Sequence, residues 1–186
     1  MTSRTLICLS LLLLLLLPIQ AFSQKRDHLT PQEVDLVKEA QILDKRIDVF
    51  IKAAERRVMV VNGTAPTGNA KQLKKEAELW GELPTGSRFE LVGDIARIFD
   101  EAITNIDDVS ARDERNPLIP KSLRKLAQAV TTIMEQLKPL RTEAKSEADI
   151  ASMELLNEDA QSILAAANKL PPEVVDKKAK KNDKKN

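Results

Sequence analysis

The sequence is poor in the residue types that most often perform catalysis or bind metals. Its 186 residues include one cysteine, one histidine and no tyrosine. The cysteine, Cys8, lies in a leucine-rich N-terminal segment, so the remainder of the chain cannot form an internal disulfide bond and must depend on packing. The histidine, His28, precedes the first expected helix, where we expect it to be solvated. A serine or threonine nucleophile would therefore lack its usual base.

Metal centres and attached haems are equally hard to build from this composition. A di-iron bundle needs glutamates followed three residues later by histidine, and an attached haem needs cysteines. Carboxylates cluster at Asp107, Asp108, Asp113 and Glu114, but their spacing matches no calcium loop and Arg112 lies between them. We interpret the cluster as a solvated helix end. The sequence thus predicts no cofactor and no metal site, and an enzyme is the least favoured class.

The N-terminal segment has the layout of a secretory signal peptide. Arg4 supplies a positive charge, an apolar run follows from Leu6 to Leu17, and Ala21-Phe22-Ser23 has the small residues of a cleavage site. The run is shorter than the ~20 apolar residues of a transmembrane helix. We predict a signal peptide over residues 1–23, cleaved before Gln24. The expected product is an exported bacterial protein, periplasmic or extracellular, with no transmembrane segment.

The sequence after the predicted signal peptide is typical of helices and has no strand pattern. Thr30-Pro31-Gln32-Glu33 has the pattern of a capping box with proline at the first helical position. Apolar residues then recur at spacings of three and four as far as Val61, and Asn62-Gly63 supplies a stop. This pattern predicts one uninterrupted helix of about 30 residues.

Two further start signals follow an irregular, glycine-containing region. Asn69 is expected to cap a short helix in which Leu73, Ala77 and Trp80 share one face. Ser87-Arg-Phe-Glu90 is a second capping box, and the apolar spacing after it predicts a long helix as far as Val109.

The last part of the helical region is divided by Pro139. A helix is expected from Lys121 to the residues before this proline, and Ser146 with Asp149 predicts the start of another. The alternative is one long helix kinked at Pro139. We favour two helices, because a continuous helix would not need the start signal at Ser146.

These elements predict an all-α protein, an antiparallel four-helix bundle with a short extra helix in the connection between its first two helices. We expect a flexible lead over residues 24–29, the bundle domain over 30–172, and a disordered lysine-rich tail over 173–186.

Two patterns in the bundle have both a functional and a structural interpretation. Trp80 is either an exposed anchor for a partner or part of a buried face that closes one end of the bundle, and we favour burial. Charged residues at seven-residue spacing predict either a charged binding groove or ion pairs between the first and second long helices, and we favour ion pairs. These residues are Lys38, Lys45 and Lys52 on the first helix and Asp94, Glu101 and Asp108 on the second.

The C-terminal tail concentrates positive charge that the mildly acidic body lacks. Such a tail could contact an anionic membrane or another polyanion, although a purely solubilising tail explains it as well. An acidic body argues against a specific nucleic-acid interface. The lysines concerned are Lys177, Lys178, Lys180, Lys181, Lys184 and Lys185.

The favoured function is therefore an exported, non-enzymatic helical protein with a binding or structural role, whose protein partner the sequence does not name. The alternative is a surface-tethering or adaptor protein that uses the tail. A third interpretation is a periplasmic chaperone, because Leu29-Thr-Pro-Gln-Glu33 resembles the leucine-threonine openings of small helical chaperones of the Spy and CpxP kind. That resemblance implies a cradle-shaped dimer, whereas the long apolar stripes predict a closed, monomeric core.

Overall fold

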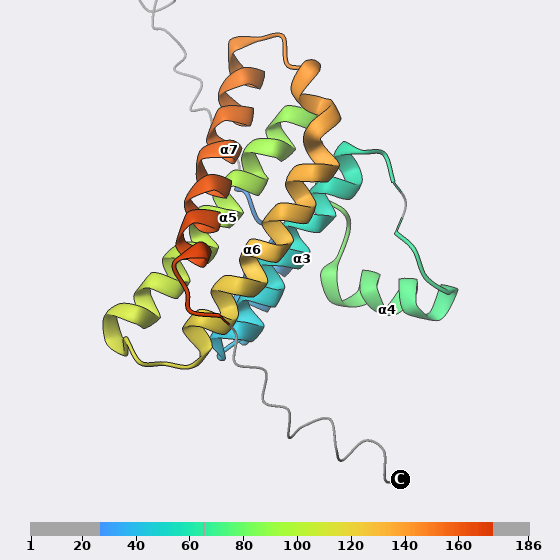
Figure 1. Ribbon diagram of the computed structural model, residues 1–186. Helices are drawn as coiled ribbons and strands as arrows, with labels where there is room; N and C mark the ends of the chain where they lie inside the picture. The colour runs from blue at the N-terminus through green and yellow to red at the C-terminus, as the bar shows by residue number, and fades with distance from the viewer. Residues whose placement is uncertain (1–26, 65, 173–186) are drawn as a thin grey trace, which may run out of the picture.

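The computed structural model describes residues 27–64 and 66–172, which are all-helical, with six α-helices packed together and no strand in that part of the chain (Figure 1). The predicted signal peptide, the start of the predicted lead and the lysine-rich tail lie outside these residues. None of the described helices is both long and apolar enough to cross a membrane. The elements are α2 (Pro31–Glu39), α3 (Leu43–Val61), α4 (Ala70–Trp80), α5 (Arg88–Arg112), α6 (Leu118–Leu137), the 3-10 helix η1 (Lys138–Thr142) and α7 (Glu147–Asn168).

The helix starts expected from the sequence are confirmed. Thr30, Asn69, Ser87 and Ser146 each precede a helix, and each side chain accepts a hydrogen bond from the backbone N–H three residues later. In each case the side chain at that later position also accepts from the backbone of the capping residue. Such caps stabilise a helix by about 1 kcal/mol each.

The single long helix expected over residues 31–61 is wrong, because the structure divides it into α2 and α3. The backbone of Ala40 departs from helical geometry, with ψ at 81°. Its carbonyl accepts a hydrogen bond from Arg46 Nε at 2.9 Å. The chain then restarts at Leu43 after Ile42, whose side chain is 55% exposed. This break lets α2 pack against α3 rather than extend it.

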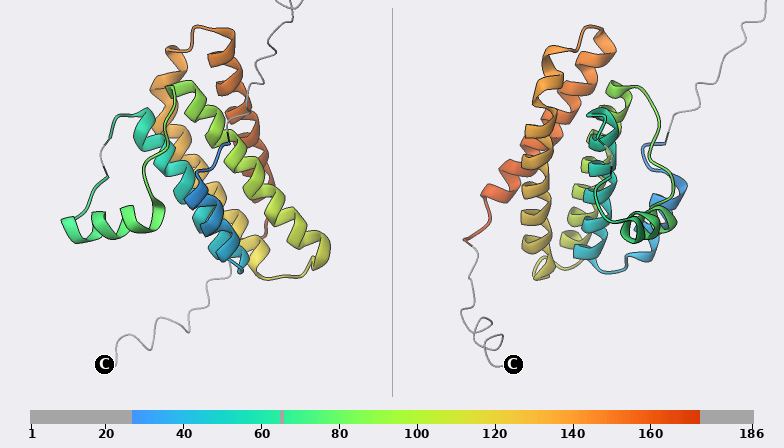
Figure 2. Two further views of the ribbon diagram at one scale, coloured as in Figure 1. Left: turned by 180° about the vertical axis from the view of Figure 1, so that it is seen from behind. Right: turned by 90° about the vertical axis from the view of Figure 1, so that its right-hand side faces the viewer.

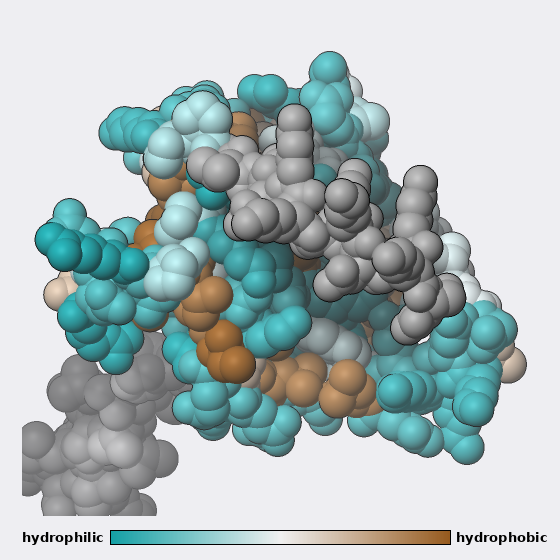
Figure 3. All heavy atoms as spheres, turned by 60° about the horizontal axis from the view of Figure 1, so that its bottom comes forward, coloured by the Kyte–Doolittle hydropathy of each residue, from teal (hydrophilic) through white to brown (hydrophobic). Residues whose placement is uncertain are grey.

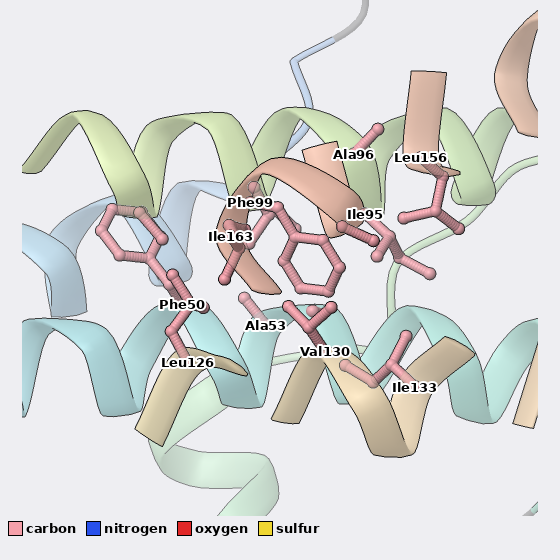
Figure 4. Packing of buried hydrophobic residues seen from close by; sticks show 14 of the residues in the cluster. Phe50, Ala53, Ile95, Ala96, Phe99, Leu126, Val130, Ile133, Leu156 and Ile163 are labelled. Atoms are coloured by element: carbon pink, nitrogen blue, oxygen red, sulfur yellow. The ribbon is translucent and has the colours of Figure 1, made fainter. Parts of the chain in front are cut away.

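The core lies between the four longest helices. Helix α5 packs against α3 and α7, and α6 packs against the same two helices from the other side. Phe50 of α3, Phe99 of α5 and Leu156 of α7 are fully buried. In Figure 4 their side chains point into one shared interior together with Val130 of α6.

The connection after α6 agrees with the expectation of two separate helices. Helix α6 ends at Leu137, Pro139 lies in the 3-10 turn η1, and α7 begins after its Ser146 cap. Helices α6 and α7 pack against each other, which a single kinked helix could not do.

Helix α4 does not close the end of the bundle, so the favoured burial of its apolar face is wrong. None of its residues is buried: on the expected apolar face Ala77 is exposed, and Leu73 and Trp80 are only half-buried. The helix stands beside α3, on the same side of the molecule as α2 and away from α6 and α7 (Figure 2, right). Its apolar residues therefore lie outside the core.

The described part of the lead is also more ordered than expected. Leu29 is 6% exposed and belongs to the core. His28 is not solvated, since its side chain is 24% exposed and Nε2 lies 2.7 Å from Oε2 of Glu101 on α5.

A carboxyl group at the contact between α5 and α7 is poorly placed for its charge. Oδ2 of Asp159 on α7 is buried and has no hydrogen-bond partner among the residues that the structure describes. Burial raises the pKa of Asp159 from an ordinary 3.8 to about 6, and the neighbouring carboxylates of Asp100 and Glu158 add to the rise. Ionisation of Asp159 therefore opposes folding.

We predict that the free energy of unfolding falls as the pH rises from about 4 to about 6, since a raised pKa in the folded state stabilises only the protonated form. Asp159→Asn should remove this loss and stabilise the protein at pH 7.5 by about 1 kcal/mol, a figure reduced for solvent screening. Urea unfolding at several pH values measures both effects.

Asp149 on the same helix supplies a control of opposite sign. Its pKa is lowered, chiefly by the hydrogen bond that its carboxylate accepts from the backbone N–H of Ser146. Asp149→Asn should therefore destabilise the protein at pH 7.5, where the carboxylate is ionised. Equal effects of the two substitutions at this pH would contradict the assignment of Asp159.

Candidate functional site

A buried ion pair connects α2 to α3. Glu33 is 0% exposed and Arg57 is 1% exposed. Arg57 donates from Nη1 to Glu33 Oε1 at 2.9 Å and from Nη2 to Oε2 at 2.7 Å. The two bonds form the bidentate arrangement that gives a guanidinium–carboxylate pair its strength and orientation.

Backbone groups complete the surroundings of this pair. Arg57 also donates to the carbonyls of Ala53 at 2.7 Å and His28 at 2.5 Å. Glu33 accepts from the backbone N–H of Thr30 at 2.9 Å, so the same carboxylate completes the capping box of α2. The lead, α2 and α3 are therefore held by one set of charge-assisted hydrogen bonds.

Arg56 extends this buried cluster to the segment after α4. Its Nε lies 3.3 Å from Glu33 Oε1, and its Nη2 donates to the carbonyls of Gly81 and Glu82. The guanidinium also lies over the Trp80 ring, 5.6 Å from the ring centroid, within the range of a cation–π contact. Arg56 thus links α3 to the segment that follows α4.

Gly81 allows the chain to pass close to α2 at this point. Its φ of +65° is a left-handed value that favours glycine, and a Cβ atom there would lie 2.9 Å from the side chain of Gln32.

A pocket of about 420 Å³ opens beside Arg56, between α3 and α4. Its apolar lining comes from both helices and from the adjoining loops: Met59, Pro66, Leu73, Ala77 and Leu83. Lys52 of α3 and Glu76 of α4 also line it and form an ion pair of 2.6 Å that bridges the two helices. We call this space the α3–α4 pocket.

The buried cluster beside the α3–α4 pocket has an excess of positive charge. Two guanidinium groups, those of Arg56 and Arg57, share the single carboxylate of Glu33. Burial lowers the pKa of Arg56 below its ordinary value and nearby Arg57 acts in the same direction, whereas Glu33 and, more weakly, Glu76 oppose them. The wall of the pocket therefore carries a desolvated positive charge.

A second, more polar groove of about 660 Å³ lies on the other side of α3, against α6. It shares Lys52 and Met59 with the α3–α4 pocket. Its principal charged groups are already paired, because Lys125 contacts Asp48 at 2.6 Å. The groove therefore offers less to a ligand than the α3–α4 pocket does.

The residues singled out in the sequence have different positions from those expected. Trp80 is half-buried at the end of α4 and supports Arg56. The expected ion pairs between the seven-residue stripes do not form: Lys52 pairs with Glu76, and Glu101 contacts His28. The break before α3 places Lys38 on a different helix from Lys45 and Lys52, so the three do not share one face.

The carboxylates at the end of α5 give no metal site in the described residues. Asp107, Asp108, Asp113 and Glu114 are all exposed, and no group of three metal-binding side chains occurs in that part of the chain. The tail lysines lie outside it.

Sequence reasoning missed Glu33, Arg56 and Arg57 as a site. The capping box alone accounts for Glu33 in the sequence, and charged residues on a helix are usually exposed. The available signal was the pair Arg56-Arg57 beside Ala53, Ala54 and Val58, where two arginines flank the apolar stripe.

No protein-family model, curated protein sequence or solved structure matches this chain.

We predict that Glu33→Gln lowers the free energy of unfolding by about 3–5 kcal/mol, because it leaves two buried guanidinium groups without a counter-charge. The matched control is Asp35→Asn on the same helix, where the carboxylate is 72% exposed and pairs only with Lys38. That change should cost about 0.5 kcal/mol or less. Urea unfolding followed by circular dichroism measures both, and similar losses would contradict the role given to Glu33.

Proposed function

We propose that this chain is an exported, non-enzymatic helical protein that binds an apolar group in the α3–α4 pocket. In this proposal α3, α5, α6 and α7 act as an antiparallel four-helix bundle, a rigid scaffold on which α4 forms the outer wall of the site. The observation that carries the proposal is the α3–α4 pocket itself, with its apolar lining outside the core.

The physical basis is the exposed apolar surface that the pocket leaves to water. Met59, Leu73 and Leu83 are only half-buried and do not belong to the core. Covering such surface releases about 25 cal/mol per Å². The volume falls within the range of about 300–1,000 Å³ that is typical of sites for small ligands.

Two features of the sequence support the rest of the proposal. The layout of residues 1–23 favours export, and the scarcity of histidine and cysteine favours binding over catalysis.

Trp80 then acts as a support of the site, since its ring holds the guanidinium of Arg56 against the pocket.

Filling the pocket tests this proposal. Ala77→Phe places an aromatic ring in the lining of the pocket and should weaken binding of the neutral fluorescent probe N-phenyl-1-naphthylamine by about tenfold or more, because the ring occupies the space of the probe. The control is Ala151→Phe, at an exposed position on α7. Equal binding by both variants and the unaltered protein would show that the probe does not use this pocket.

A second candidate function is tethering to an anionic membrane surface. Arg124 Nη2 of α6 donates to the carbonyl of Pro171 at 2.5 Å, which fixes the end of the described chain beside the start of α6. On the visible part of this end of the molecule, hydrophobic patches lie between hydrophilic side chains (Figure 3). A lysine-rich segment that follows Pro171 would add electrostatic attraction to lipid headgroups, about 1 kcal/mol per lysine at low salt.

Deletion of residues 176–186 tests tethering. The unaltered protein should sediment with phosphatidylglycerol vesicles at low salt and be released at high salt, since screening weakens the attraction. The shortened protein should remain in the supernatant at both salt concentrations. Vesicle binding that is independent of salt and of the deletion would exclude this function for the tail.

A further inference from the structure

Arg56 has donor capacity that the protein itself does not use. Its Nη2 donates to two backbone carbonyls, whereas its buried Nε lies 3.3 Å from Glu33 Oε1 without a hydrogen-bond partner among the described residues. No hydrogen bond of Nη1 occurs among the described residues, although the side chain is only 5% exposed and lines the α3–α4 pocket. A guanidinium offers five N–H groups in a fixed plane, so an anion placed at Nη1 would meet donors that are already oriented.

The charge of the surroundings favours an anion at the same place. Arg56 and Arg57 together carry two positive charges against the one buried carboxylate of Glu33. The other carboxylates that line the pocket offset this excess only weakly: Glu76 has the smallest of the four effects on the pKa of Arg56 and contacts Lys52 at 2.6 Å, and the Glu82 residue is exposed. A buried unbalanced charge is costly, and a ligand carboxylate would reduce that cost.

We propose that the α3–α4 pocket binds a monocarboxylate with an unbranched hydrocarbon chain, its carboxylate on Nη1 of Arg56 and its chain against Met59, Leu73 and Leu83. This inference rests on the proposed function, to which it adds the chemical class of the ligand. The pocket combines one oriented cation with a predominantly apolar lining, which are the two halves of such a molecule.

Other classes of ligand fit the same surroundings less well. A peptide segment would bury backbone N–H and C=O groups against a lining whose polar groups, apart from the free donor of Arg56, are largely engaged with each other. A multiply charged phosphate would be bound more strongly by a cluster of several free cations, and the neighbouring Lys52 is engaged with Glu76.

The test of the headgroup compares three ligands on the unaltered protein. Decanol differs from decanoate only in its headgroup, and octanoate differs from decanoate only in the length of its chain. Isothermal titration calorimetry should give decanoate an affinity at least tenfold above that of decanol, because only decanoate presents a charge to Arg56. Octanoate should bind more weakly than decanoate, by about three- to fourfold for each CH₂ removed. Equal affinities of decanoate and decanol would overturn this inference while leaving an apolar pocket in place.

Variants locate the carboxylate. Arg56→Gln should remove the preference of the protein for decanoate over decanol, whereas Lys74→Gln, which removes one positive charge from an exposed position on α4, should preserve it. A preference that survives Arg56→Gln would overturn the inference. If Arg56→Gln does not fold, the comparison of headgroups on the unaltered protein decides.

The outcomes separate the inference from the proposed function. Binding of decanol and of the neutral probe, with no advantage for decanoate, rejects only the carboxylate. Absence of binding for decanoate, decanol and the neutral probe rejects the apolar site and, with it, the ligand class.

Discussion

The arrangement of this protein depends on one buried ion pair, that of Glu33 with Arg57. Ions of this kind are stable away from water only when their geometry is good and their remaining donors and acceptors are satisfied. Here the carboxylate is bound bidentately and also accepts from Thr30, while the guanidinium donates to two backbone carbonyls. Only Nε of Arg57 is left without a hydrogen-bond partner among the described residues. The bonds that form require α2 to lie against α3, and the break at Ala40 permits it.

This dependence explains which parts of the fold could be predicted from the sequence. The caps at Asn69, Ser87 and Ser146 depend on residues three positions apart, so a local pattern is sufficient. The break between α2 and α3 has no proline or glycine to mark it, and the apolar spacing continues through it. Its cause is the contact between Glu33 and Arg57, which are 24 positions apart in the chain.

The candidate site was hidden from the sequence for a related reason. Periodicity identifies the apolar face of α4, with Leu73, Ala77 and Trp80, but it does not say what covers that face. In the structure no part of the core does, because α4 is held by polar links, those of Arg56 and Lys52, rather than by burial. An amphipathic helix held by polar contacts alone keeps its apolar face free to contact a ligand.

The buried cluster of Glu33, Arg56 and Arg57 connects the stability of the protein with ligand binding. Arg56 contacts Glu33 on one side and the segment after α4 on the other, so a ligand that neutralises its charge would relieve repulsion between the two arginines. Binding to the folded state alone stabilises that state in proportion to the logarithm of ligand concentration. Natural sequences commonly give up stability where they bind. In the described part of the chain, the meeting of an unbalanced buried charge with an uncovered apolar wall is the strongest sign of a functional site.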